Sequence, residues 1–255
     1  MMIKTASRAG HIYLATALLF IVTAVIGFVP TSLALISQMS SGQESTVPFV
    51  IHFHAAALTL WLLMLLVQSS LIFLDKPQLH KKLGLISLFL APCVLLSLFG
   101  IEKLSFDRIA AAAASSDQVD AVLQGIPSSL LIHGASYLFF PAFYIWAILS
   151  RQRDSETHKR MMILATLVLM IPALGRMLSV SRIIPDFGLS IIDARHFYML
   201  LLIVPALIYD TLKLGRPHRA YIYGLTLVGV WIVAAHFLWD ATWWAEITTS
   251  LFGPG

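Results

Sequence analysis

The chain has 255 residues, of which 58% are hydrophobic and 12% are charged, and its mean hydropathy is +0.84. These values exclude an ordinary soluble domain. The net charge is +4, yet the 17 Lys and Arg residues fall in short clusters between apolar runs, a distribution that favours membrane topology over nucleic-acid binding. Cys93 is the only cysteine, which excludes an internal disulfide, a thiolate zinc site and a Cys-ligated iron–sulfur cluster.

Seven apolar runs follow one another, each long enough for a transmembrane helix. They lack the alternation of barrel strands, and a helix satisfies its own backbone in lipid. The first run exceeds the apolar core of a signal peptide and predicts an uncleaved helix. The predicted fold is all-α, one domain over residues 1–255 with about seven transmembrane helices. The expected spans are 11–36, 48–74, 83–102, 126–150, 160–182, 195–214 and 219–244.

The basic residues are divided unevenly between the two sides of such a bundle. The N-terminus and the loops after the second, fourth and sixth spans hold twelve Lys and Arg residues, whereas the other side holds five. The positive-inside rule then predicts a cytoplasmic N-terminus and a periplasmic C-terminus in a bacterial inner (plasma) membrane. The five residues on the periplasmic side are Lys103, Arg108, Arg176, Arg182 and Arg195.

Three further features concern the helices themselves. The loop 103–125 is expected to contain one or two short surface helices, with a helix start near Ser115. Tryptophans at the end of the seventh span predict an interfacial aromatic belt. Four spans carry a proline near the middle, where it frees a carbonyl and kinks the helix, and kinks at similar depth can open a bundle. These prolines are Pro92, Pro141, Pro172 and Pro205.

Four of the nine histidines fall on the predicted cytoplasmic side, three of them directly before basic residues at a helix start. We expect these side chains to be solvated and to face anionic headgroups rather than a metal. They are His11, His80, His158 and His218.

The other five histidines come from four different spans and map to the outer third of the membrane, in a layer about 10 Å thick. Polar residues inside a membrane are costly and usually face the bundle interior or a water-filled cavity, so this layer predicts a functional site. Residues two apart lie on different faces of a regular helix, which restricts the pair His52 and His54. The predicted metal ligands are His52, His54, His133, His196 and His236.

Carboxylates lie at helical spacing from two of these histidines. Asp240 follows His236 by four residues and is expected either to ligate beside it or to orient it, and Asp193 stands in the same relation to His196.

Arginines and a tyrosine complete the predicted site. Arg176, Arg182 and Arg195 would bind the cofactor, and Tyr137 would line the cavity of His133. Because Arg176 lies about two turns inside its span, it needs a partner. The candidates are Glu102, Asp240, a bound anion or a haem propionate. Asp240, Arg176 and Tyr137 are the predicted catalytic residues.

Histidine with carboxylate suits zinc, iron or copper, and no local motif selects among them. Haem b needs one or two axial histidines on facing helices and a basic residue near its propionates, which His54, His133 and Arg176 provide, with His236 as another possible axial ligand. The spans show no matching inner layer of histidines and so indicate no electron path across the whole membrane.

The predicted function is a metal- or haem-binding membrane oxidoreductase with a periplasmic His/Asp site and a lipophilic or quinone-like substrate. The alternatives are a proton-coupled transporter with the same histidines as a relay, a zinc-dependent membrane hydrolase, and a non-catalytic accessory subunit.

A resemblance accompanies these patterns. The segment His52-Phe53-His54, then Trp61, Gln68 and Leu79-His80-Lys81-Lys82-Leu83-Gly84, and later His158-Lys159-Arg160-Met161-Met162, resembles uncharacterised bacterial polytopic membrane proteins of the domain-of-unknown-function type over about residues 50–180. The resemblance implies a bacterial inner-membrane protein and assigns no residue a role.

Overall fold

The computed structural model describes residues 4–42, 47–115 and 125–252, and these residues form helices and turns but no strand. Seven of the helical segments are long and apolar enough to cross a membrane, which confirms the predicted all-α bundle. In chain order the elements are α1 (Lys4–Ser40), α2 (Phe49–Phe73), α3 (Pro77–Gly84), α4 (Ser87–Ala114), α6 (Gly125–Ser150), α7 (Ser155–Leu167), η1 (Val168–Met170), α8 (Ile171–Ser179), α9 (Ile191–Leu214), α10 (Arg219–Trp239) and α11 (Thr242–Phe252).

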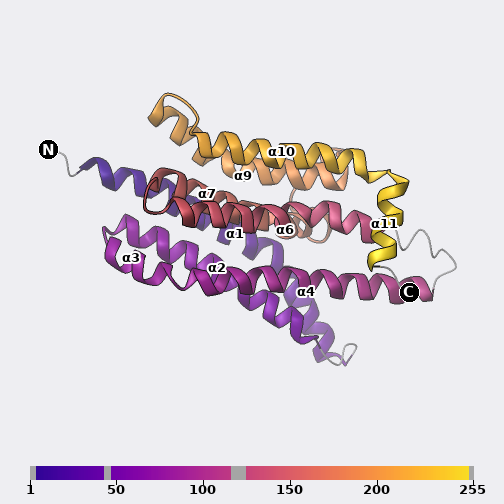
Figure 1. Cartoon of the computed structure of the whole chain (residues 1–255). Coiled ribbons are helices and arrows are strands. Elements are labelled where there is room, and N and C mark those ends of the chain that lie inside the picture. The colour runs from indigo at the N-terminus through magenta and orange to yellow at the C-terminus, as the bar shows by residue number, and fades with distance from the viewer. Residues whose placement is uncertain (1–3, 43–46, 116–124, 253–255) are drawn as a thin grey trace.

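The long helices run roughly along one axis, and their connections alternate between its two ends (Figure 1). The start of α1, helix α3, the α6–α7 turn and the α9–α10 turn lie at one end, called here the basic end because these segments carry the basic clusters. The end of α4 and helix α11 lie at the opposite, far end. Large apolar side chains such as Phe89, Leu212 and Phe237 are about 80% exposed on the sides of the bundle, as expected for a surface that faces lipid.

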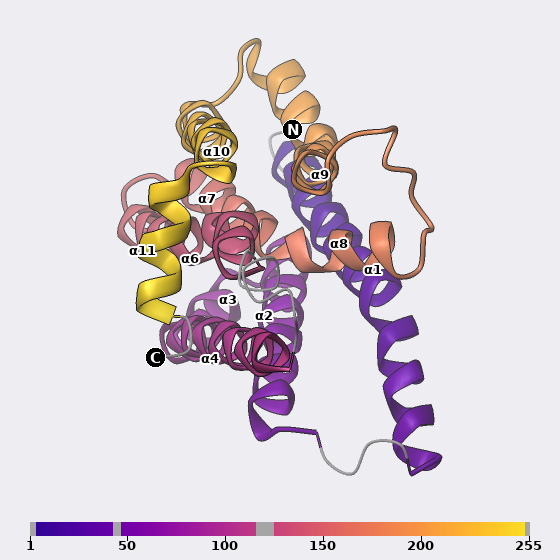
Figure 2. The ribbon, with the colours of Figure 1, turned by 90° about the vertical axis from the view of Figure 1, so that its right-hand side faces the viewer.

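The span formed by α7, η1 and α8 is the centre of the protein. In its most apolar stretch 78% of the residues are buried, against 17–50% in the other six spans. Helix α7 packs against α6 and α10, and α8 packs against α1 and α9. Seen along the axis, α6 and α7 lie side by side in the middle of the bundle (Figure 2).

Among the described spans, proline interrupts the α-helix in this central one alone. The 3₁₀ turn η1 ends directly before Ile171 and Pro172, at the start of α8, where the missing N–H of proline removes no helical bond. Pro92, Pro141 and Pro205 lie inside helices that continue past them.

The expected loop 103–125 is corrected in its first half, because α4 continues to Ala114. The charged residues from Glu102 to Arg108 end the apolar run, but they do not end the helix. Lys103 and Asp107 pair at i,i+4 with a distance of 2.8 Å, and a run of alanines follows. The helix start predicted near Ser115 falls mostly on 116–124, outside the described residues.

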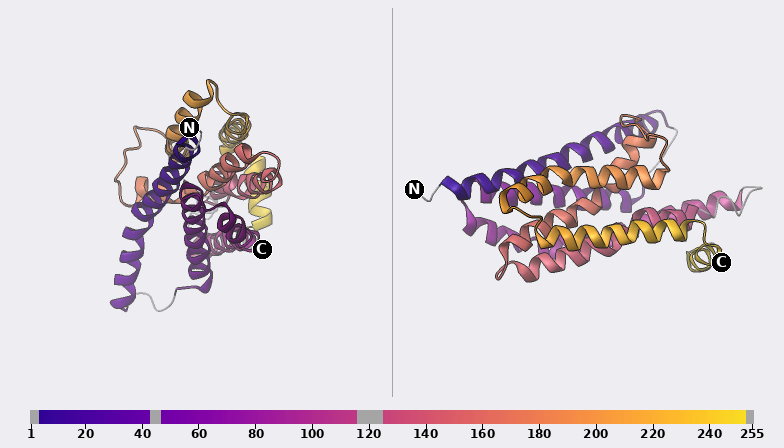
Figure 3. Two further views of the ribbon diagram at one scale, coloured as in Figure 1. Left: turned by 90° about the vertical axis from the view of Figure 1, so that its left-hand side faces the viewer. Right: turned by 90° about the horizontal axis from the view of Figure 1, so that it is seen from above.

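The seventh span, by contrast, is shorter than expected. Helix α10 ends at Trp239, Asp240 is its C-cap residue, and Trp243 and Trp244 belong to α11. The view from above shows α11 nearly end-on while α10 lies in the plane, so α11 runs across the far end of the bundle (Figure 3).

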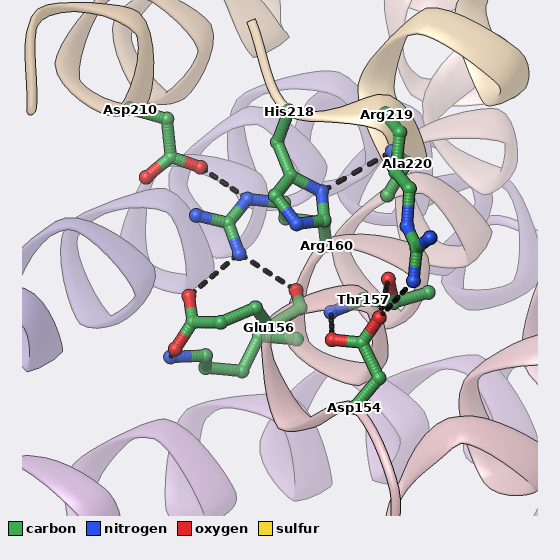
Figure 4. A network of polar contacts seen from close by, with 9 residues as sticks. Asp154, Glu156, Thr157, Arg160, Asp210, His218, Arg219 and Ala220 are labelled. Atoms are coloured by element: carbon green, nitrogen blue, oxygen red, sulfur yellow. Dashed lines mark hydrogen bonds and ion pairs between the residues drawn. The ribbon is translucent and has the colours of Figure 1, made fainter. Parts of the chain in front are cut away.

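Polar contacts join the starts of two helices at the basic end (Figure 4). Asp154 caps α7 by accepting from the N–H of Thr157 at 2.9 Å and from its hydroxyl at 2.7 Å, and it also accepts from Arg219 at 2.6 Å. His218 caps α10 by accepting from the N–H of Ala220 at 3.2 Å. The turns that lead into α7 and α10 are thereby tied together.

Candidate functional site

His54, on α2, is held by helix α4. Its Nδ1 lies 3.1 Å from the Ser97 hydroxyl oxygen, and that hydroxyl donates its own hydrogen to the Val94 carbonyl at 2.7 Å. Ser97 therefore accepts from His54, which puts the imidazole proton on Nδ1. The Nε2 lone pair of His54 is left for another partner.

His133, on α6, is held by the same helix α4 in the same way. Its Nδ1 lies 3.4 Å from Glu102 Oε2 and 3.4 Å from the hydroxyl of Ser129, which donates to Glu102 Oε1 at 2.7 Å. Both neighbours accept from Nδ1, so the Nε2 lone pair of His133 is also left for another partner. His133 and Arg176 both lie within electrostatic range of His54.

Glu102 is the residue around which this part of the site is organised, and it is only 6% exposed. Besides the contacts to His133 and Ser129, it accepts a hydrogen bond from the Tyr137 hydroxyl. The prediction that Tyr137 accompanies His133 thus has a structural basis, because both side chains meet the same carboxylate. Arg176 was one expected partner of Glu102 and does not take that place.

Arg176 and Arg195 form a second feature at the far end. Arg176 donates to the Pro172 carbonyl at 3.2 Å and lies 4.4 Å above the Phe28 ring. The Nε of Arg195 is buried without a partner, its guanidinium packs directly against the α8 backbone at Gly175, and it lies within electrostatic range of Arg176. No ion pair involves either arginine within the described ranges, so both charges are available to an anion.

Arg182, the third predicted arginine, is exposed on the loop after α8. It borders a separate hollow that also contains Asp186.

His196 and His236 form another cluster, between α9 and α10. His236 Nε2 lies 2.6 Å from Asp193 Oδ1. His196 Nδ1 lies 2.7 Å from the Ile192 carbonyl, and its buried Nε2 has no partner. Asp193, rather than Asp240, is thus the carboxylate at His236. Helical i,i+4 geometry does not extend to Asp240, because α10 has already ended there and the residue is exposed.

The five predicted histidines therefore divide into His54 with His133, His196 with His236, and the exposed His52. Within the part of the chain that the structure describes, no three His, Cys, Asp or Glu side chains form a group able to hold a bare metal ion. The predicted five-histidine metal site is therefore replaced by two separate pairs of histidines.

His80 and His158, which we expected to be solvated loop residues, are half-buried and face each other. Their ring centres are 6.4 Å apart, and both line a cavity of about 760 Å³ at the basic end. The signal in the sequence was spacing, because His80 follows His54 by about the same number of residues as His158 follows His133.

Fold and site together define a polytopic membrane protein with paired histidines at both ends of its bundle. No family model, curated protein or solved structure matches the chain. The resemblance to uncharacterised polytopic membrane proteins stays a prediction.

Proposed function

We propose that this protein is a membrane oxidoreductase that binds haem b at the far end, with His54 and His133 as axial ligands. The observation that carries the proposal is the matched anchoring of these two imidazoles. They come from different helices, both donate through Nδ1 to groups of α4, and both keep Nε2 for a ligand. A metal-bound histidine usually donates the N–H of its other ring nitrogen to a hydrogen-bond acceptor.

A pair of histidines favours haem over a bare metal ion. Structural and catalytic zinc sites take three or four protein ligands, whereas haem b supplies four nitrogens itself and needs only one or two axial side chains. The zinc-hydrolase alternative is therefore the weaker one.

Arg176 and Arg195 supply the charge that haem propionates need. Two neighbouring guanidinium groups without a carboxylate partner fit two carboxylates well, because such hydrogen bonds are charge-assisted. Arg182 is exposed elsewhere and has no part in this proposal.

The substrate class we propose is a quinone-like lipid that reaches the site from the bilayer. Oxidation of a quinol to its quinone releases two electrons and two protons, and a haem held by His54 and His133 would supply a one-electron acceptor. The Glu102 carboxylate beside Tyr137 and His133 is placed to accept a proton there. We infer a bacterial inner membrane with the basic end cytoplasmic, which puts this site on the periplasmic side.

Proton-coupled transport is a second candidate, favoured by one specific observation. Glu102, buried in the bundle and hydrogen-bonded to three neighbours, has the form of an intramembrane proton site. This reading needs no cofactor and predicts pH-dependent solute flux in proteoliposomes from protein that contains no haem.

Visible absorption of the purified protein, before and after reduction, tests the proposal. A Soret band that sharpens on reduction is expected, and His54→Ala and His133→Ala should each weaken it because each removes a ligand of the far-end haem. The matched control is His52→Ala, an exposed residue on the same helix, which keeps the full band. A wild-type protein without a Soret band after incubation with haem would overturn the proposal.

A further inference from the structure

The cavity at the basic end is built around two histidines. His80 of α3 and His158 of α7 both line it, their ring centres are 6.4 Å apart, and their planes are nearly perpendicular at 86°. Its volume of about 760 Å³ lies in the range of pockets that hold cofactors. The other residues that line the cavity are mostly apolar, and they include Trp61, Met64 and Met162.

The hydrogen bond of His158 repeats the pattern of the two far-end histidines. His158 Nδ1 lies 2.8 Å from the Ala147 carbonyl oxygen, and His80 Nδ1 lies 3.3 Å from the Gln68 carbonyl oxygen. A carbonyl oxygen only accepts, so the short contact of His158 puts its proton on Nδ1 and leaves its Nε2 lone pair for a ligand.

Gln68 gives His80 a second option. The amide orientation that satisfies both ends of Gln68 places its nitrogen 2.5 Å from His80 Nδ1, to which it donates, and its oxygen 3.0 Å from the Gly84 N–H, from which it accepts. His80 then carries its imidazole proton on Nε2. Ligation through Nε2 therefore requires the proton of His80 to move to Nδ1, where the Gln68 backbone carbonyl at 3.3 Å can accept it. His158 has no such neighbour and is the fixed member of the pair.

The two histidine pairs are related by the helix repeat. On α2 the Gln68 carbonyl that holds His80 follows His54 by fourteen residues, and on α6 the Ala147 carbonyl that holds His158 follows His133 by fourteen. Fourteen residues are about four helical turns, so each set lies on one face of its helix, and the two pairs are separated by about 21 Å along the axis.

The spacing of the rings fits one iron between them. Two imidazoles on opposite sides of a metal, each with a metal–nitrogen bond of about 2 Å, have ring centres about 6 Å apart. We propose that His80 and His158 are the axial ligands of a second haem b, seated in the cavity at the basic end. The exposed side chains of Lys81 and Arg151 at its rim are placed to meet the propionates.

Buried aromatic rings occupy the level between the two sites. Trp61 follows His54 by seven residues, Phe140 follows His133 by seven, and their ring centres are 4.9 Å apart with both side chains buried. Seven residues are half of fourteen, so both rings lie at about half the axial separation of the two pairs.

With two haems the protein carries one electron from end to end. Iron(II) at one site becomes iron(III) as iron(III) at the other becomes iron(II), and no bond or proton changes. This electron path rests on the proposed function, since it needs the far-end haem, whereas binding at His80 and His158 does not.

The test is the haem content per chain of the full-length protein, loaded with haem and measured by pyridine haemochromogen absorbance against protein concentration. Two haems are expected in the wild type, and one in His158→Ala and in His80→Ala. Added imidazole should restore the second haem in His158→Ala, because it fills the vacated ligand position, which a merely structural defect would not allow. His11→Ala, an exposed histidine at the same end, is the control and keeps two.

The outcomes separate the two proposals. One haem in the wild type, lost in His133→Ala and kept in His158→Ala, overturns the second site and leaves the proposed function standing. One haem lost in His158→Ala and kept in His133→Ala supports the site at the basic end and overturns the far-end site. A wild type that binds no haem overturns both.

Discussion

Arg160 of α7 and Asp210 of α9 form an ion pair inside the bundle, with 2.5 Å between Nε and Oδ2 and both side chains almost fully buried. Arg160 also donates through Nη1 to the carboxylate and the carbonyl of Glu156, at 2.7 Å each. In the sequence Arg160 counts as one more basic loop residue. In the fold it joins the central span to α9 (Figure 4).

Breaking this pair from one side should be costly. Arg160→Met leaves the Asp210 carboxylate buried without its partner, and we expect a loss of about 3–5 kcal/mol in the free energy of unfolding. The double variant Arg160→Met/Asp210→Leu should recover much of the loss, because no charge is then buried. SDS titration of the purified protein measures both, with Lys103→Met, which removes the exposed Lys103–Asp107 pair, as a surface control worth less than about 1 kcal/mol. Additive losses in the double variant would contradict the coupling.

Asp154 gives the basic end a dependence on pH. Hydrogen bonds from Thr157, with the Arg219 charge nearby, hold the pKa of Asp154 well below its ordinary value. A depressed carboxylate pKa contributes stability above the unfolded pKa of about 3.9 and loses it as the pH falls further. Wild type should therefore exceed Asp154→Asn in melting temperature from pH 7 to 5, with the difference closing below about pH 4. A difference that does not change with pH would contradict this assignment.

The helical spans could be predicted from hydropathy, because a bilayer requires apolar segments. The ends of the helices could not be predicted in this way. Hydropathy marks where lipid ends, whereas a helix ends where its backbone bonds end. Lys103 and Asp107 are polar, yet they stabilise α4, and Trp243 is apolar, yet the chain turns before it at Asp240. The predicted spans therefore stop too early in one helix and too late in another.

The sequence predicts how deep in the bundle the candidate site residues lie, but not the direction in which their side chains point. His52 and His54 share a level, and only His54 turns toward α4. Glu102 gathers three donors from α6, a relation between distant segments that no local spacing reveals. His80 and His158 were missed because neighbouring lysines and arginines indicate a solvated loop, whereas in the fold both rings are half-buried and line one cavity.

Gly134 permits close packing between α6 and α10. A Cβ there would lie 2.1 Å from the Trp231 ring, which also donates to the Leu131 carbonyl at 3.3 Å. Gly134→Ala should therefore displace a rigid ring and cost about 1–3 kcal/mol. Gly229→Ala on α10, where nothing lies within 4 Å, should instead raise stability by about 0.5–1 kcal/mol. Thermal unfolding in detergent compares them, and equal effects would contradict the packing argument.

Arg176 should set the potential of the far-end haem. A nearby positive charge favours the reduced form, so Arg176→Gln should lower the midpoint potential and weaken haem binding, whereas Arg176→Lys should retain most of the potential. Redox titration followed in the Soret region measures the shift, with the exposed Arg182→Gln as the control. An unchanged potential in Arg176→Gln would place the propionates elsewhere.

Trp61 should govern the rate of electron exchange between the two haems. Its ring contacts Phe140 at the level between the histidine pairs, and its Nε1 donates to the Thr166 hydroxyl at 3.1 Å. Trp61→Leu should slow equilibration between the haems several-fold after photoreduction and leave two haems per chain, because no ligand is removed. Thr166→Val removes the same hydrogen bond but keeps the ring, so it separates the electronic role of Trp61 from its packing role. If Thr166→Val slows the exchange as much as Trp61→Leu does, the hydrogen bond and local packing control the rate, and the aromatic pair is not the path.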